Sequence, residues 1–538
     1  MTMKKVIGLS ALVLLGACAG EGEPVNNTEE APENNEASEA DASNEEQADP
    51  DALVINMASD VSSLDPHFGN DHPSLNVKRT IYDTLVSTDE NLELEMSLAE
   101  SFEQVDDTTW EVVLQEGIEF HDGAELNAES VKLNIERMLD PDLASPVAFM
   151  FDMIEEVELV DDYSLLIHTE YPFAPLRTHF AHPAGQQISP LVIEEDYAAM
   201  EDGADPGSVV NENPTGTGFY VLEEQEPGSS YELVQNENYW NGEPGAETLT
   251  FEIVPEDLTR VGQLETDSAQ IIGHLNPNDV QRVEDNEETK VARYESASLA
   301  YLGFQNEEEP FDDPLVREAI ALAVNKEDIV NSVMNGTAQP AKGPLAPIVF
   351  GASDQLEQIV QDMETAQDLL AEAGFDEGFE TELWVDDSRA WQDAAEIIQA
   401  QLAPIGITVD IISMESGVHR DHLNDGDAPM FISSWGTVTG DADYGLYPVF
   451  HSESRGVSGN RTFYENSEVD DLLEAARQES DEAEREQLYF DAQELIMDDL
   501  PLVPLYHIEH LAGLQEDVEN FVIHPSSLYD MFPVTRSE

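Results

Sequence analysis

The chain has 538 residues, of which 41% are hydrophobic, so it is long enough for two or three domains with sizeable cores and is neither wholly disordered nor collagen-like. Its 115 acidic residues against 21 lysines and arginines give a formal net charge of −94, which repels phosphate backbones and anionic lipid headgroups and excludes nucleic acid as a partner. The single cysteine excludes a disulfide framework and any multi-cysteine metal site.

The first residues have the pattern of a bacterial lipoprotein signal. Lys4 and Lys5 precede a run of apolar and small residues over 6–17, which suits a signal-peptide core and is too short to span a bilayer. The run ends in Leu-Gly-Ala-Cys at Cys18, which resembles the lipobox, where cleavage precedes a lipidated cysteine. We expect residues 1–17 to be removed and Cys18 to carry a two-chain lipid anchor on the extracytoplasmic face of the membrane. A chance free thiol behind an ordinary signal is the alternative.

Residues 18–51 are predicted to form the lipidated cysteine and a disordered acidic linker. Positions 19–51 contain twelve acidic residues, no lysine or arginine and no periodic apolar pattern, so this stretch repels itself and forms no core. The excess of carboxylates continues along the chain, which keeps only 5 lysines and 14 arginines after residue 17. Such a composition indicates exposure to strong salt, where self-repulsion is screened, and high external pH is the alternative cause.

The body after residue 52 combines helix and strand patterns. Asn127 can cap a helix whose apolar face extends to Met138. Apolar and polar residues alternate over 249–253, as in a half-buried strand. Asp313 can cap a second helix, with Pro314 in its first turn.

The pattern continues through the second half of the chain. Gly374 follows a helical run and is placed to end it. Apolar spacing predicts helices over 391–402 and 469–476, and the alternation over 407–411 predicts a strand. Helices alternating with strands favour an α/β architecture.

Several blocks of the body resemble, in order and spacing, those of a known family. The most specific are 116–123, which reads Glu-Gly-Ile-Glu-Phe-His-Asp-Gly, and the following 127–131. The other matching blocks are 64–66, 82–86, 98–102, 213–220, 238–240, 303–306, 310–313 and 316–320. From about residue 53 to its end, the chain thus resembles the family 5 solute-binding proteins of ABC importers, which bind dipeptides, oligopeptides, glutathione or nickel.

The resemblance implies an α/β fold of the periplasmic-binding-protein type II-like class, bilobal with an extra inserted domain. The ligand would lie between the lobes and be buried by hinge closure. The implied division is domain I at 52–90, 205–300 and 505–538, inserted domain II at 91–204, and domain III, the second ligand-binding lobe, at 301–504. The family further implies a monomeric binding protein that is not an enzyme, needs no cofactor, and delivers a peptide ligand to ABC permease subunits.

The segment 435–444 is the predicted centre of ligand recognition. It follows an apolar run over 430–434, so it should emerge at a strand end that faces the cleft. Its resemblance to dipeptide-binding relatives assigns Asp441 to the α-ammonium of the ligand, because a desolvated ammonium needs a negative partner. A loop-capping role for this aspartate is the alternative. The sequence around 440–452 looks most like the glutathione-binding branch.

A cation is also expected in the site. Arg389 stands before the 391–402 helix, at a place similar to that of an arginine in dipeptide-binding relatives, and it is predicted to bind the ligand carboxylate through its planar fork. A surface ion pair is the alternative. The other predicted ligand contacts are Trp435, Gly440, Asp443, Tyr444 and Phe68; the aromatic residues among them would form walls, or alternatively part of the core. No metal ligand is assigned.

Two other functions stay open. The sequence has no Gly-x-Ser-x-Gly elbow and no His-Glu-x-x-His motif, which argues against common hydrolases. It does have three His-x-x-His pairs, whose spacing places both rings on one face where the chain is helical. These pairs are His179/His182, His419/His422 and His507/His510. A nickel- or metal-chelate-binding protein of the same family is therefore one alternative, and a peptide-sensing surface receptor is the other.

Overall fold

The structure is a computed structural model that describes residues 51–456 and 459–537. The predicted signal peptide, Cys18 and the predicted linker up to residue 50 lie outside the described residues. Within the described part of the chain, no helix combines the length and the apolar character that crossing a membrane requires.

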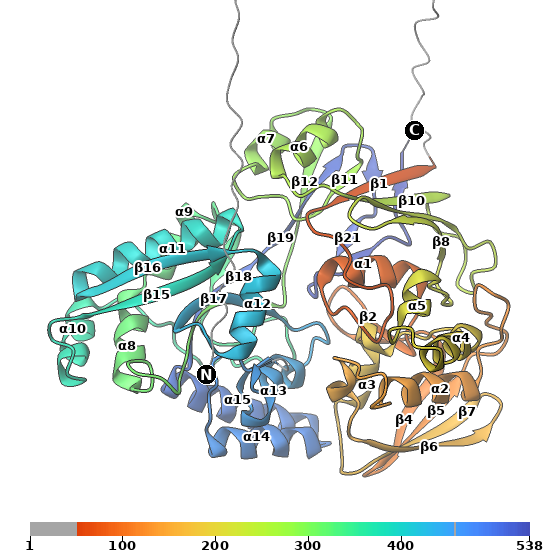
Figure 1. The fold of residues 1–538 in the computed structure, drawn as a ribbon, viewed down its shortest axis with the longest axis horizontal. Coiled ribbons are helices and arrows are strands. Elements are labelled where there is room, and N and C mark those ends of the chain that lie inside the picture. Colours follow the sequence, from red (N-terminus) through yellow and green to blue (C-terminus); the bar gives the residue numbers. More distant parts are fainter. Residues whose placement is uncertain (1–50, 457–458, 538) are drawn as a thin grey trace, which may run out of the picture. The chain divides into compact units, whose positions relative to one another are not determined.

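Three larger β-sheets organise the described chain. The first has seven strands and gathers segments from the beginning, the middle and the end of the sequence (Figure 1). Strand β1 pairs in parallel with β10 and β11, and the other pairings are antiparallel. In spatial order the strands are β12 (Thr289–Tyr294), β19 (His510–Gln515), β11 (Ile271–Ile272), β1 (Ala52–Met57), β10 (Thr248–Ile253), β9 (Ser230–Gln235) and β8 (Tyr220–Glu226).

The second sheet has six strands and the third has four. In the six-stranded sheet β15 pairs in parallel with β16 and β17, and the remaining pairs are antiparallel. Its order is β14 (Ala338–Pro340), β18 (Leu502–Ile508), β13 (Ser298–Phe304), β17 (Met430–Gly436), β15 (Phe379–Asp386) and β16 (Ile407–Met414). The antiparallel four-stranded sheet has the order β4 (Ala99–Asp106), β5 (Thr109–Leu114), β7 (Ser164–Thr169) and β6 (Ile154–Asp161).

Three two-stranded sheets complete the strands. They are β2 (Val86–Thr88) with β3 (Leu94–Met96), β20 (Val518–Glu519) with β23 (Thr535–Arg536), and β21 (Val522–Ile523) with β22 (Tyr529–Asp530). The α-helices before the six-stranded sheet are α1 (His72–Ile81), α2 (Ala128–Met138), α3 (Leu176–Ala181), α4 (Pro190–Glu201), α5 (Ser208–Glu212), α6 (Asp257–Glu265) and α7 (Val280–Glu284). Those between its strands are α8 (Pro314–Ala323), α9 (Lys326–Ser332), α10 (Met363–Glu372), α11 (Arg389–Leu402), α12 (Ser416–Asp425), α13 (Ala442–Phe450), α14 (Ser467–Gln478) and α15 (Glu482–Asp499).

Local sequence signals account for the helices and strands that were predicted. Asn127 caps α2, and Ser130 returns the hydrogen bond to close a capping box. Asp313 caps α8 with Pro314 at its first position, and Gly374 adopts a φ of +91° just after α10. Helices α11 and α14 bury their predicted apolar stripes, and β10 and β16 contain the predicted alternating runs. These predictions are confirmed.

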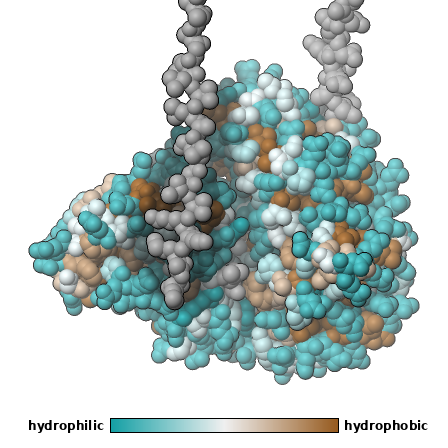
Figure 2. All heavy atoms as spheres, viewed as in Figure 1, coloured by the Kyte–Doolittle hydropathy of each residue, from teal (hydrophilic) through white to brown (hydrophobic). Residues whose placement is uncertain are grey.

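The six-stranded sheet is covered by helices on both faces. One apolar core joins its strands to α8, α9, α10 and α11, and a second joins its other face to α13, α14 and α15. Figure 1 shows α14 and α15 lying side by side beneath this sheet. The four-stranded sheet packs on α2 and α3, and the seven-stranded sheet packs on α1 and α4. The visible surface over these cores is mostly hydrophilic, as the composition requires (Figure 2).

Within residues 51–456 and 459–537, the chain passes between the seven-stranded and the six-stranded sheets twice. It leaves through 295–297, between β12 and β13, and returns through Glu509, between β18 and β19. Each of the three larger sheets falls within one predicted domain range, except that the boundaries after residues 300 and 504 cut through β13 and β18. Both strands belong entirely to the six-stranded sheet. The three-domain division itself stays a prediction.

A buried ion triad fixes α2 against its neighbours. Arg137 on α2 donates to Asp65 at 2.7 Å and to Asp196 on α4 at 2.8 Å, and all three side chains are at most 1% exposed. Because Asp65 lies in the loop between β1 and α1, the triad joins this loop, the helix α2 and the helix α4 at one point.

Candidate functional site

The segment 435–444 connects the end of β17 to the start of α13. Gly440 has a φ of +72°, and a Cβ atom there would lie 2.7 Å from the Cβ of Leu92, so only glycine fits this turn without strain. The turn is followed directly by Asp441, the N-cap of α13. The predicted strand over 430–434 is confirmed, and the segment leaves its carboxyl end as expected.

Asp441 has partners within the protein. It is 3% exposed, and its Oδ1 accepts a hydrogen bond from the backbone N–H of Asp443 and another from Arg485 at 2.5 Å. Arg485 lies on α15, 44 residues away along the chain, and stacks near the ring of Tyr489. Asp441 therefore caps α13 and balances a buried guanidinium. Its predicted contact with a ligand ammonium stays a prediction.

Asp443 is held even more completely. Its carboxylate accepts from Arg477 at 2.7 Å and 3.2 Å and contacts Nε2 of His179 at 3.0 Å, and the residue is 1% exposed. Burial alone would raise the pKa of Asp443, but Arg477 and His179 hold it well below its usual range. His179 lies on α3, which packs on the four-stranded sheet, and Arg477 lies on α14, which packs on the six-stranded sheet. The Asp443 carboxylate therefore joins two helices that cover different sheets.

Trp435 and Tyr444 pack together at the end of β17. Their ring centroids are 5.5 Å apart, and the indole N–H of Trp435 donates to the backbone oxygen of Tyr444 at 2.9 Å. Asn70, just before α1, donates to the Tyr444 hydroxyl at 3.3 Å. Burial raises the pKa of Tyr444, and Asn70 and Arg461 act against that shift. Tyr444 is buried whereas Trp435 is partly accessible, so Trp435 is the aromatic wall that a ligand could reach.

Arg461 is a nearby cation that the sequence prediction did not include. Its guanidinium donates to Asn424 at 3.2 Å and to the Ser433 hydroxyl at 3.3 Å, and it is half-buried. No carboxylate of the described residues lies within 4.0 Å of it, which is unusual in so acidic a chain. The turn that carries it also covers Trp435, because a Cβ at Gly459 would lie 3.0 Å from the indole.

A histidine from the other side completes this group. His72, the first residue of α1, lies beside Gly436, where a Cβ atom would come within 3.7 Å of the imidazole. Residues of the α1 region and of the six-stranded sheet thus meet here. We use the name Trp435 cluster for Asn70, His72, Trp435, Tyr444 and Arg461.

Two other predicted ligand residues, Arg389 and Phe68, are not members of the Trp435 cluster. Arg389 begins α11, its side chain is 61% exposed, and its nearest carboxylate is Asp393 at 3.9 Å. Phe68 lies against Gly207, where a Cβ would come within 2.8 Å of its ring, and its backbone oxygen accepts from Lys78. The ligand roles of Arg389 and Phe68 stay predictions.

Most of the paired histidines contact protein groups, although Nε2 of His182 and Nε2 of His419 have no hydrogen-bond partner among the described residues. His179 contacts Asp443 and the Met150 carbonyl, His422 contacts Asp427, and His507 contacts the Ser298 carbonyl. Only the pair His419/His422 lies on one helix, α12. Across residues 51–456 and 459–537, no group of three or more His, Cys, Asp or Glu side chains is placed to hold a metal ion.

The chain belongs to the bacterial extracellular solute-binding proteins, family 5, whose middle-region pattern matches residues 93–456. The predicted family is therefore confirmed, as are the extracytoplasmic placement and the prediction that the chain is a binding protein and not an enzyme.

Individual relatives agree with this assignment. The glutathione-binding protein GsiB of Pectobacterium atrosepticum is 31% identical over 485 residues, which cover 88% of this chain and 92% of that protein. The ABC transporter-associated periplasmic binding protein DppA from Helicobacter pylori, in complex with the peptide STSA, superposes with a TM-score of 0.82 at 27% identity, covering 90% of this chain and 98% of that chain. The oligopeptide-binding protein AppA from Bacillus subtilis, in complex with a nonapeptide, gives 0.80 at 24%, with 90% and 99% covered. The predicted α/β bilobal fold is confirmed.

Proposed function

We propose that this chain is the solute-binding protein of an ABC importer and that it captures a peptide at the Trp435 cluster. Glutathione is the narrower candidate for the ligand. The ligand class is supported by the relatives, one of which is named for glutathione and another of which holds a peptide. The place is supported by the meeting of the α1 region with the end of β17, close to the 295–297 connection between the two sheets.

The position of Arg461 is the observation that carries this proposal. A peptide brings its terminal carboxylate out of water, and that carboxylate needs a cation that is not already neutralised. Arg461 satisfies this requirement, because it is half-buried, bonds Ser433 two residues before Trp435, and has only neutral acceptors as its hydrogen-bond partners. We assign the ligand carboxylate to Arg461 ahead of the more exposed Arg389.

For the ammonium end of the ligand we retain the predicted partner, Asp441. A ligand ammonium bound by Asp441 would share that carboxylate with Arg485 and with the capped helix α13. The connections 295–297 and Glu509 would serve as the hinge about which the lobes close on the ligand. The protein would act as a monomer and pass the peptide to the permease subunits.

Isothermal titration calorimetry tests the ligand class. Purified protein is titrated with di- to pentapeptides, glutathione, nickel and a nickel–histidine chelate. We expect saturable one-to-one binding of at least one peptide or of glutathione. Binding of nickel or of its chelate alone would refute the peptide proposal and favour the metal-binding alternative. If the protein binds a peptide but a strain that lacks the protein still takes up that peptide normally, the peptide-sensing receptor would be favoured.

The lipid anchor is a separate part of the proposal. Because the lipobox-like sequence places the only cysteine at position 18, Cys18→Ser should prevent lipidation and release the protein from the membrane fraction. Immunoblots of membrane and soluble fractions from cells that express each form measure this. A variant that still sediments with membranes as the unchanged protein does would show that Cys18 is not the anchor.

We also propose that the acidity is an adaptation to strong salt. The support is the net charge of −94 and the scarcity of lysine along the whole sequence. At high ionic strength the repulsion between surface carboxylates is screened, so the net charge reflects the medium and says little about the charge of the ligand.

A further inference from the structure

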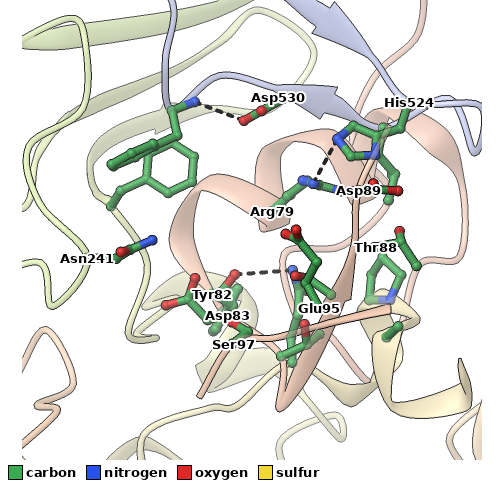
Figure 3. Close-up of a pocket in the computed structure, with 18 of the residues that line it drawn as sticks. Arg79, Tyr82, Asp83, Thr88, Asp89, Glu95, Ser97, Asn241, His524 and Asp530 are labelled. Atoms are coloured by element: carbon green, nitrogen blue, oxygen red, sulfur yellow. Dashed lines mark hydrogen bonds between the residues drawn. The ribbon is translucent and has the colours of Figure 1, made fainter. Parts of the chain in front are cut away.

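A separate cavity lies away from the Trp435 cluster and shares no residue with it. Its volume is about 390 Å³, and it is bounded by the end of α1, the β2–β3 hairpin, the 181–186 turn, the 239–241 loop and the carboxyl-terminal strands β21 and β22. Figure 3 shows Arg79, Asp83, Glu95 and Asp530 around this hollow. These groups give the cavity its chemical character.

Arg79 and Asp83 bring opposite charges into the cavity without forming an ion pair within 4.0 Å of each other. Arg79 is partly buried and donates to Nε2 of His524 at 3.2 Å, and no carboxylate of the described residues lies within 4.0 Å of its guanidinium. Asp83 accepts only from neutral donors: Thr217 at 2.8 Å, Trp240 at 3.0 Å and Tyr239 at 3.2 Å. Burial lowers the pKa of Arg79 and raises that of Asp83, so each charge is incompletely compensated by its surroundings.

The rest of the lining favours a ligand with net positive charge. Five carboxylates line the cavity against the one guanidinium, and they are Asp83, Asp89, Glu90, Glu95 and Asp530. Gln186, 3% exposed, also lines it, and its Oε1 has no hydrogen-bond partner among the described residues. A buried acceptor without a donor is costly, and a ligand N–H would satisfy it.

One wall of the cavity is apolar. The rings of Phe219, Tyr239 and Phe532 lie within 5.4–5.8 Å of one another, with Trp240 beside Tyr239. Such a wall can pack against a short chain of methylene groups. The cavity thus offers a site for a carboxylate, a site for a cation and an apolar surface in the same lining.

We propose that this cavity binds a basic amino acid, with the α-carboxylate on Arg79 and a cationic nitrogen on Asp83. A free amino acid of this kind carries one carboxylate and two cationic nitrogens, which matches the lining in charge and in kind. The second nitrogen faces two other carboxylates of the lining, the exposed Glu95 and the half-buried Asp89. The site is distinct from the peptide site and does not depend on the identity of the peptide.

The test uses the full mature chain and three matched probes. L-lysine contains both charged ends, norleucine lacks the ε-ammonium, and cadaverine lacks the carboxylate. Calorimetric titration should show saturable binding of L-lysine, with norleucine and cadaverine each weaker by at least about tenfold. No binding of L-lysine at millimolar concentration, or equal binding of cadaverine, would overturn the proposal.

Variants locate the bound amino acid. Arg79→Gln and Asp83→Asn should each weaken L-lysine by at least about tenfold, because each leaves one charged end of the ligand unpaired. Arg177→Gln is the matched control, since Arg177 lies over the Trp110 ring outside the cavity. Because Asp83→Asn alters a hydrogen-bonded carboxylate, the exposed Glu95→Gln provides a second test with an expected loss of about threefold. Loss of L-lysine binding in Arg461→Gln, with retention in Arg79→Gln, would place the amino acid at the Trp435 cluster and overturn the assignment.

Discussion

Replacing Asp443 by asparagine is expected to lower the free energy of unfolding by about 3–5 kcal/mol, because it leaves the buried Arg477 without a countercharge. The carboxylate has two bonds to Arg477 and one contact to His179, and an amide supplies only one acceptor oxygen and no charge. Denaturant unfolding of the two forms measures the difference. Asp421→Asn on the exposed face of α12 is the matched control, with an expected change within about 0.5 kcal/mol.

The pH dependence gives a second measure of the same interaction. Since the folded pKa of Asp443 lies well below its usual range, the stabilisation is fully present above the unfolded pKa of about 3.9 and is lost as the pH falls through the folded pKa. The difference in unfolding free energy between the unchanged protein and Asp443→Asn should therefore shrink as the pH falls below about pH 4. A difference below about 1 kcal/mol at pH 7 would show that the ion pair is not formed in solution.

Arg137→Met is expected to destabilise the protein by about 3–5 kcal/mol as well. The substitution keeps most of the side-chain volume but leaves Asp65 and Asp196 as two unpaired carboxylates in a fully buried place. Arg420→Met, at an exposed position of α12, is the matched control and should change the stability little.

The cause of that loss can be separated from side-chain packing. If the unpaired carboxylates are responsible, the triple variant Asp65→Asn, Arg137→Met, Asp196→Asn should be more stable than Arg137→Met alone, since it removes all three charges together. Thermal and denaturant unfolding of both variants measure this. A triple variant less stable than the single one would assign the effect to packing.

Much of the fold could be predicted because its signals are local. The Asn127 capping box, the Asp313–Pro314 start and the glycine after α10 each lie within a few residues of the helix end that they define. The arrangement of the three sheets could not be derived in this way, since β1 pairs with β10 almost 200 residues later along the chain. It came from the resemblance to the family.

The candidate site was predicted less completely, because the partners of its charges are remote in sequence. The neighbouring residues indicate that Asp441 caps a helix, but its ion-pair partner Arg485 is 44 residues away along the chain. Arg477, the partner of Asp443, is 34 residues away. Arg461 stands 17 residues beyond Tyr444, and no spacing rule relates the two. Glu465 stands four residues beyond Arg461, so a search for arginines without an acidic residue at helical spacing would have passed over it.

The assignment of the ligand carboxylate to Arg461 is tested most directly by calorimetry with one peptide in two forms. The tightest-binding peptide of the panel and its C-terminal amide are titrated into the unchanged protein, Arg461→Gln and Arg389→Gln. The unchanged protein and Arg389→Gln should prefer the free acid by at least about tenfold, and Arg461→Gln should bind both forms with equal, weaker affinity. If Arg461→Gln keeps the preference, or Arg389→Gln loses it, the carboxylate does not bind at Arg461.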